Sequence, residues 1–219
     1  DNFFKNMIKI YKKIKNVNKS KISDNGNNNW VLQFDNCDNK NESFSWYTRT
    51  NCIVENSENS LFYILGNSYG DHLVPTIFGL DKKLSIYKAR FENCYIDINK
   101  DCKNRTNIIL KKYKKISENF DNNILIISLN TYEFSYKKLT NILEQLPNNI
   151  KVVYIYPHPS TEIFSDNTKF NDYKIKKKEN LLILKKIADR FNFVTFDPYT
   201  YLCPDENCNI ENYNSYFTD

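Results

Sequence analysis

Short apolar runs alternate along the chain with longer stretches of mixed polarity. Five of these runs have the length and the aliphatic content of strands that are buried on both faces of a parallel sheet. The predicted strands cover residues 61–65, 84–89, 124–129, 152–156 and 193–196.

Helices are predicted between these strands, over residues 71–80, 104–119, 135–146 and 174–191. An alternation of strands and helices is typical of α/β proteins, in which helices cover a parallel sheet. In such sheets ligands bind beyond the carboxyl ends of the strands. We therefore expect functional residues directly after the strands.

The N-terminal 29 residues have a different composition. Residues 1–21 interleave seven lysines with aromatic and aliphatic residues, and residues 23–29 have the composition of a linker. The basic segment fits an amphipathic helix beside a membrane, but a helix packed on the domain or a frayed connection fits its composition better. We interpret residues 1–29 as a basic leader and linker, and residues 30–219 as one domain. No signal peptide precedes Asp1, so we expect a leader that was removed or a longer parent chain.

Composition argues against several classes of function. The 31 basic and 26 acidic residues give a net charge of +5, and the lysines are spread along the chain, which disfavours nucleic-acid binding. No apolar stretch approaches the roughly 20 residues that cross a bilayer. Because the sequence has neither a GxGxxG motif nor a CxxC pair, we expect no cofactor and no metal.

The six cysteines fall into three pairs that are close in sequence. Buried thiols or a metal site are alternatives, but the spacing is not that of a zinc site and only two histidines could contribute. We predict three disulfides, and hence an oxidising compartment such as the periplasm or the extracellular space. The predicted pairs are Cys37 with Cys52, Cys94 with Cys102, and Cys203 with Cys208.

A serine follows the first predicted strand, in the sequence Gly66-Asn67-Ser68-Tyr69-Gly70. A serine in a tight turn before a helix lies near backbone N–H groups, which can stabilise the oxyanion formed when it attacks an ester. On this local sequence alone, a helix-capping serine is the better interpretation. Asn130 follows the third strand and could donate to the same oxyanion, although a turn-forming asparagine is the more common case.

The order of these motifs resembles that of the SGNH hydrolases. Gly66-Asn67-Ser68 resembles their first block, usually Gly-Asp-Ser, and Ser128-Leu129-Asn130-Thr131 resembles the third, usually Gly-x-Asn-Asp. Tyr216-Phe217-Thr218-Asp219 resembles the approach to the last block, Asp-x-x-His.

More narrowly, the chain is similar to SGNH domains fused C-terminally to membrane acyltransferases of family 3, which O-acetylate bacterial surface glycans such as lipopolysaccharide O-antigen. Those domains have a cysteine pair before the serine and a Leu-Cys-x-x-x-x-Cys loop before the last block, as Cys37, Cys52 and residues 202–208 do here. The resemblance covers about residues 30–219. It implies a three-layer α/β/α, flavodoxin-like fold with a five-stranded parallel sheet in the order 2-1-3-4-5.

The resemblance also implies a mechanism. Ser68 would be the nucleophile, the Ser68 N–H and Asn130 would form the oxyanion hole, and Asp219 would orient a histidine three residues later, beyond this sequence. The chain departs from the family pattern at Asn67, at Ser128 and Thr131, and in having no glycine between positions 80 and 121 for the second block.

Four further residues are candidates for the substrate pocket: Asn67, Tyr69, His72 and His158. His158 follows the fourth predicted strand and His72 lies one helical turn after the serine, so either could replace the missing base, although a pocket-lining or surface role is more common for histidine.

The resemblance favours an acyltransferase that passes acetyl groups from an acyl donor to a glycan acceptor. The partner would be a membrane acyltransferase domain in the same parent chain. A carbohydrate esterase with the same residues, or an inactive glycan-binding domain, stays open.

Three disulfides predict that the native protein contains no thiol that can be alkylated. Intact mass measured before and after alkylation without reductant should be unchanged. Addition of six alkyl groups would contradict the prediction.

Overall fold

The computed structural model describes most of the sheet and the helices beside it. The described residues are 50–55, 60–67, 70, 73, 74, 77, 84–90, 100–129, 136–147, 150–157, 163, 165–191 and 193–202.

A six-stranded sheet forms the centre of the described part, with the order β1-β3-β2-β4-β5-β6. Every neighbouring pair is parallel except β1 and β3. The five predicted strands correspond to β2 through β6, and their predicted order 2-1-3-4-5 is confirmed. The strands are β1 (Thr50–Val54), β2 (Ser60–Gly66), β3 (Ser85–Arg90), β4 (Asn122–Ser128), β5 (Lys151–Ile155) and β6 (Val194–Phe196).

The prediction of five strands was wrong by one, because β1 adds an antiparallel edge strand. Its sequence, TNCIV, begins with two polar residues and ends with two aliphatic ones. A run of this kind is too short to be recognised from its apolar content. Cys52 and Ile53 are nevertheless buried against the sheet.

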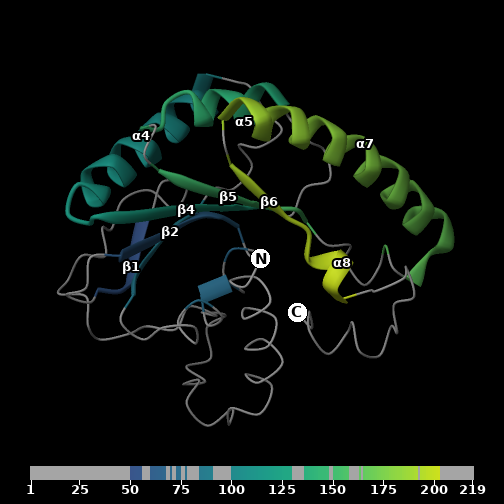
Figure 1. Ribbon diagram of the computed structural model, residues 1–219, viewed down its shortest axis with the longest axis horizontal. Helices are drawn as coiled ribbons and strands as arrows, with labels where there is room; N and C mark the ends of the chain where they lie inside the picture. Colours follow the sequence, from purple (N-terminus) through teal and green to yellow (C-terminus); the bar gives the residue numbers. More distant parts are fainter. Residues whose placement is uncertain are drawn as a thin grey trace, which may run out of the picture.

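Helices α4 (Lys100–Ser117), α5 (Tyr136–Leu143) and α7 (Asn167–Phe191) arch over one face of the sheet (Figure 1). Helical residues at positions 70, 73, 74 and 77 belong to the opposite face, where Val74 and Ile77 are buried. The α/β class is thus confirmed, as are the predicted helices over residues 104–119, 135–146 and 174–191. Of the predicted helix over residues 71–80, only positions 73, 74 and 77 lie within the described residues, and these are helical.

Helix α7 begins earlier than the predicted residue 174. The Asp166 carboxylate accepts hydrogen bonds from the Thr168 and Lys169 N–H groups, at 2.9 and 3.1 Å, and so caps the helix further back along the chain.

Alternate residues of each central strand face the two sides of the sheet. On the side of α4, α5 and α7 the core is rich in tyrosine: Tyr63 contacts Tyr113 edge to face, with ring centroids 4.8 Å apart. Burial raises the pKa of Tyr113 and Tyr154, so these hydroxyls stay protonated. The opposite side is mostly aliphatic and includes Ile64, Ile86 and Ile126, with Phe62 and Phe196 as aromatic members.

Gly66 ends β2 at a very close approach to β4. A β-carbon on Gly66 would lie 2.3 Å from the Ser128 carbonyl oxygen, which is far inside van der Waals contact. Gly66 and Ser128 are also register partners in the parallel pair. Only glycine therefore allows β2 and β4 to stay at this separation where both strands end.

We expect Gly66→Ala to lower the free energy of unfolding by about 1–3 kcal/mol, because the new methyl group overpacks a backbone atom. Gly70→Ala is the matched comparison, since its nearest atom is the movable Ile64 Cγ2 at 3.1 Å. Thermal melts of both variants test this, and a Gly66→Ala protein at least as stable as the Gly70→Ala protein would contradict it.

Candidate active site at the carboxyl edge of the sheet

The strand order reverses between β2 and β4. From β2 the chain passes through the helical residues near position 74 on the aliphatic face and reaches β3. From β4 it passes through α5 on the opposite face and reaches β5. Connections that leave two adjacent strands toward opposite faces leave a crevice at the carboxyl ends of those strands, which is where ligands bind in open α/β sheets.

A hydrogen-bonded turn follows β2 at this point. The Gly70 N–H donates to the Asn67 carbonyl oxygen at 2.9 Å, and Gly70 has helical conformation. Asn67 is buried, with 5% of its surface exposed. We call the segment from Asn67 to Gly70 the nucleophile turn, because Ser68, the nucleophile predicted from the sequence, lies within it.

Most predicted site residues lie outside the described residues. These are Ser68, Tyr69, His72, Asn130, His158 and Asp219, so their geometry stays a prediction. Asn130 directly follows Leu129, which is buried after β4, and His158 directly follows Pro157, the second residue after β5. Of the predicted residues, the structure brings Asn67 to the carboxyl edge, and two strand ends lead into Asn130 and His158.

Cys52 on β1 is disulfide-bonded. Its predicted partner Cys37 lies outside the described residues, as do Cys94, Cys203 and Cys208. Cys102 is known only by its backbone, in helix α4. The three pairings therefore stay predictions.

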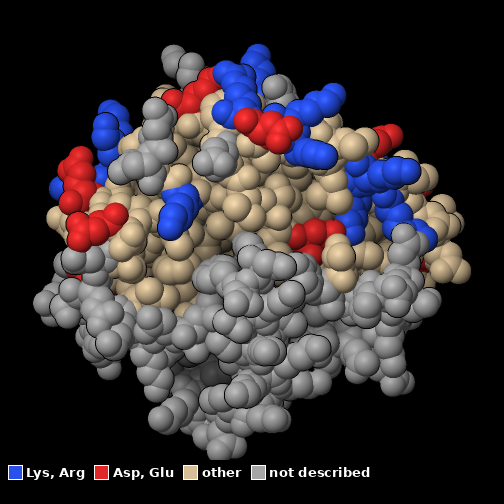
Figure 2. All heavy atoms as spheres, in the orientation of Figure 1, with Lys and Arg blue, Asp and Glu red and all other residues tan. Residues whose placement is uncertain are grey.

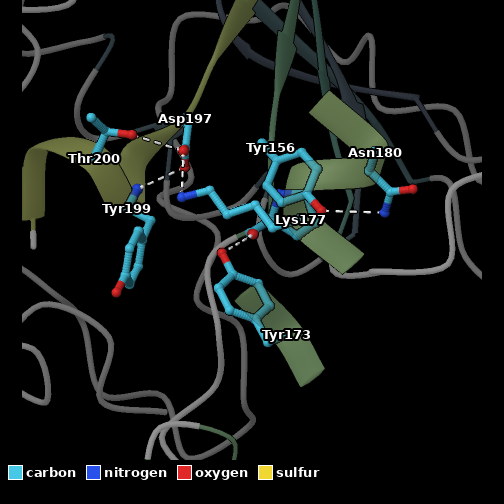
Figure 3. A network of polar contacts seen from close by, with 8 residues as sticks. Tyr156, Tyr173, Lys177, Asn180, Asp197, Tyr199 and Thr200 are labelled. Carbon is cyan, nitrogen blue, oxygen red and sulfur yellow. Dashed lines mark hydrogen bonds and ion pairs between the residues drawn. The ribbon is translucent and has the colours of Figure 1, made fainter. Parts of the chain in front are cut away.

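A network of polar contacts joins β5, β6 and α7 at the same carboxyl edge (Figure 3). The Tyr173 hydroxyl donates to the Pro157 carbonyl oxygen at 3.3 Å. The Asn180 amide donates to the Tyr156 hydroxyl, also at 3.3 Å. Burial, partly offset by that hydrogen bond and reinforced by the negative charge of Asp197, raises the pKa of Tyr156 to about 12. The chain just before His158 is thus held against α7.

Asp197 connects β6 to helix α8 (Pro198–Leu202). Its carboxylate accepts hydrogen bonds from the Tyr199 N–H at 3.1 Å and the Thr200 hydroxyl at 2.8 Å, which caps the short helix. Lys177 of α7 forms an ion pair with the same carboxylate at 2.7 Å, and both side chains are only 13% exposed. The Lys177 ammonium also lies 4.0 Å from the centre of the Tyr199 ring.

A comparison with protein families identifies the chain. The family described as the SGNH domain fused to AT3 domains matches residues 36–219. The chain belongs to this family. The predicted resemblance is confirmed, and membership implies a role related to O-acetylation. Comparisons with curated proteins and with solved structures find no significant match.

The ion pair and cap at Asp197 were not predicted from the sequence of this SGNH domain. Asp197 followed by Pro198 is a helix-start signal, since a capping carboxylate precedes a proline in the first turn, and this signal could have revealed the cap. Nothing in the sequence indicates that Lys177, in a run of three lysines, is the one that turns inward.

Charges are spread over the surface of the SGNH domain seen in Figure 2, where acidic side chains lie among the lysines and arginines of the helices. Among the described residues, no group of three or more histidine, cysteine, aspartate or glutamate side chains could hold a metal ion. No helix in the described part of the chain is long and apolar enough to cross a membrane.

We expect Asp197→Ala to lower the free energy of unfolding by about 2–4 kcal/mol, because it leaves the largely buried Lys177 without its ion pair and removes the α8 cap. Glu144→Ala is the control, since Glu144 and Arg190 form an exposed pair worth less than about 1 kcal/mol. Equal losses in the two variants, measured by urea unfolding, would contradict the prediction.

Proposed function

We propose that this domain transfers acetyl groups to hydroxyl groups of a surface glycan through an acyl-serine intermediate on Ser68. The observation that carries the proposal is the position of the nucleophile turn. It follows β2 at the reversal of strand order, in a chain whose family is fused to AT3 acyltransferase domains. A fused AT3 domain is the proposed source of the acyl group, and the proposed location is the periplasm or the cell exterior.

In the first step the Ser68 hydroxyl oxygen attacks the carbonyl carbon of the acyl donor. The general base takes the hydroxyl proton, and the negative charge that forms on the carbonyl oxygen is stabilised by the Ser68 N–H and the Asn130 amide. Collapse of this intermediate breaks the bond to the donor group, which leaves with the proton. Acyl-Ser68 remains.

In the second step a sugar hydroxyl attacks the carbonyl carbon of acyl-Ser68 and loses its proton to the same base. The bond between the acyl group and the Ser68 Oγ then breaks, Oγ takes the proton back from the base, and the acyl group leaves on the sugar. Asp219 is the residue proposed to orient the base, a histidine that the family pattern puts three residues after it. With water as the acceptor the same residues would hydrolyse an ester, so the acceptor distinguishes a transferase from a carbohydrate esterase.

One feature supports a different class of function. Asn67 replaces the aspartate that is usual beside the serine, and its side chain is buried. A glycan-binding domain that has lost catalysis would tolerate this change, and would also bind glycan without any covalent step.

Labelling of the full-length protein, including any sequence that follows Asp219, tests the nucleophile. A fluorophosphonate should label the protein, p-nitrophenyl acetate should be turned over, and Ser68→Ala should reduce both at least about 1000-fold. Ser60→Ala, at the opposite end of the same strand, is the control and should leave both unchanged.

Adding a sugar acceptor separates the outcomes. Acetylated sugar supports transfer, and release of acetate alone supports the esterase. A wild-type protein that turns over the ester no faster than the Ser68→Ala protein would contradict the proposal. If both rates equal the background rate, the result favours the non-catalytic domain.

A further inference from the structure

Lys88 is a buried lysine on β3. Only 5% of its surface is exposed, and along the strand it alternates with Tyr87 and Ala89, which face the tyrosine-rich core. Lys88 therefore shares the other face with Ile86 and with its register partner Ile64 on β2, both of which are fully buried. Its side chain enters the molecule among aliphatic groups.

A lysine in such a place is costly for stability. Moving an ammonium group out of water costs several kcal/mol before its contacts compensate, and apolar residues of similar volume commonly fill such positions at no loss. Lys88 does have an interaction partner in the structure. Packing against Ile64 and Ile86 does not itself require a charge, because methionine has a similar volume and is uncharged.

The side chain of Lys88 reaches the nucleophile turn. A β-carbon on Gly70 would lie 3.4 Å from Cε of Lys88 and 3.9 Å from the Ser128 carbonyl oxygen. The ammonium is one bond beyond Cε. The end of the lysine side chain, the last residue of the turn and the end of β4 therefore meet at one point, at the switch between β2 and β4.

We propose that Lys88 is a positioning residue for the reaction at Ser68. Its ammonium holds the nucleophile turn against β3 and adds positive potential beside the backbone N–H groups at that turn. A fixed cation in a site with little water favours the negative charge that forms on the acyl oxygen, so it accelerates acylation more than it strengthens substrate binding. This proposal rests on the proposed function, in which Ser68 is the nucleophile.

The test compares Lys88→Met and Lys88→Arg in the full-length protein, with Lys151→Met, at the exposed start of β5, as the control. The Lys88→Met protein should fold, because methionine fills a similar volume. Its melting temperature should be lower than that of the wild type, because the substitution leaves the partner of Lys88 without its interaction. This substitution should lower kcat for p-nitrophenyl acetate and the rate of fluorophosphonate labelling about tenfold or more, with little change in KM. Lys88→Arg should retain most of both rates, and the Lys151→Met protein should match the wild type.

Hydrogen–deuterium exchange of the peptide that contains Gly70 supplies a readout independent of activity. Lys88→Met should speed exchange of this segment, whose Gly70 N–H closes the turn, without changing exchange in α7. A Lys88→Met protein that is labelled as fast as the wild type would overturn the role of the charge. A Lys88→Arg protein that is labelled as slowly as the Lys88→Met protein would overturn it too. If the wild type is labelled no faster than the Ser68→Ala protein, the proposed function itself fails. In that case, equal hydrogen–deuterium exchange of the Gly70 peptide in the Lys88→Met and wild-type proteins would overturn the positioning role as well.

Discussion

The close approach of Gly66 to the Ser128 carbonyl is the constraint on which the candidate site depends. It sets the distance between the ends of β2 and β4, the two strands between which the strand order reverses. Without a side chain on Gly66, the last residues of β2 and β4 can lie in close contact at the carboxyl edge of the sheet. The first and third blocks of the family pattern follow these two strand ends in the sequence.

The remaining strand ends are held by different forces. β5 and β6 end in a polar network in which Tyr173 holds the Pro157 carbonyl, and Asp197 joins Lys177 to the start of α8. These contacts fix the backbone just before His158 and the helix that leads into Cys203. One half of the candidate site is therefore formed by backbone packing between β2 and β4, and the other half by side-chain contacts with α7. Substitutions in the two halves should affect stability through different interactions.

The central strands could be predicted because each is a short, largely aliphatic run buried on both faces. Their order was implied by the resemblance to the SGNH hydrolases. Edge strand β1 could not be predicted, because the buried residues Cys52 and Ile53 are too few to form a recognisable apolar run. Ser68 was selected as the candidate nucleophile from the order and spacing of several weak motifs, and its role stays a proposal. Lys88 and Lys177 were missed. In a lysine-rich sequence, only the fold shows which lysines turn inward.

The central claim is that Ser68 carries the acyl group during the reaction. Peptide mapping by mass spectrometry, after acid quenching of the full-length protein in the presence of an acetyl ester, measures this directly. The account predicts that the peptide containing Ser68 gains the mass of one acetyl group, and that a sugar acceptor added before the quench removes it. An acetyl group that is absent from this peptide, or present equally in a Ser68→Ala protein, would contradict the account.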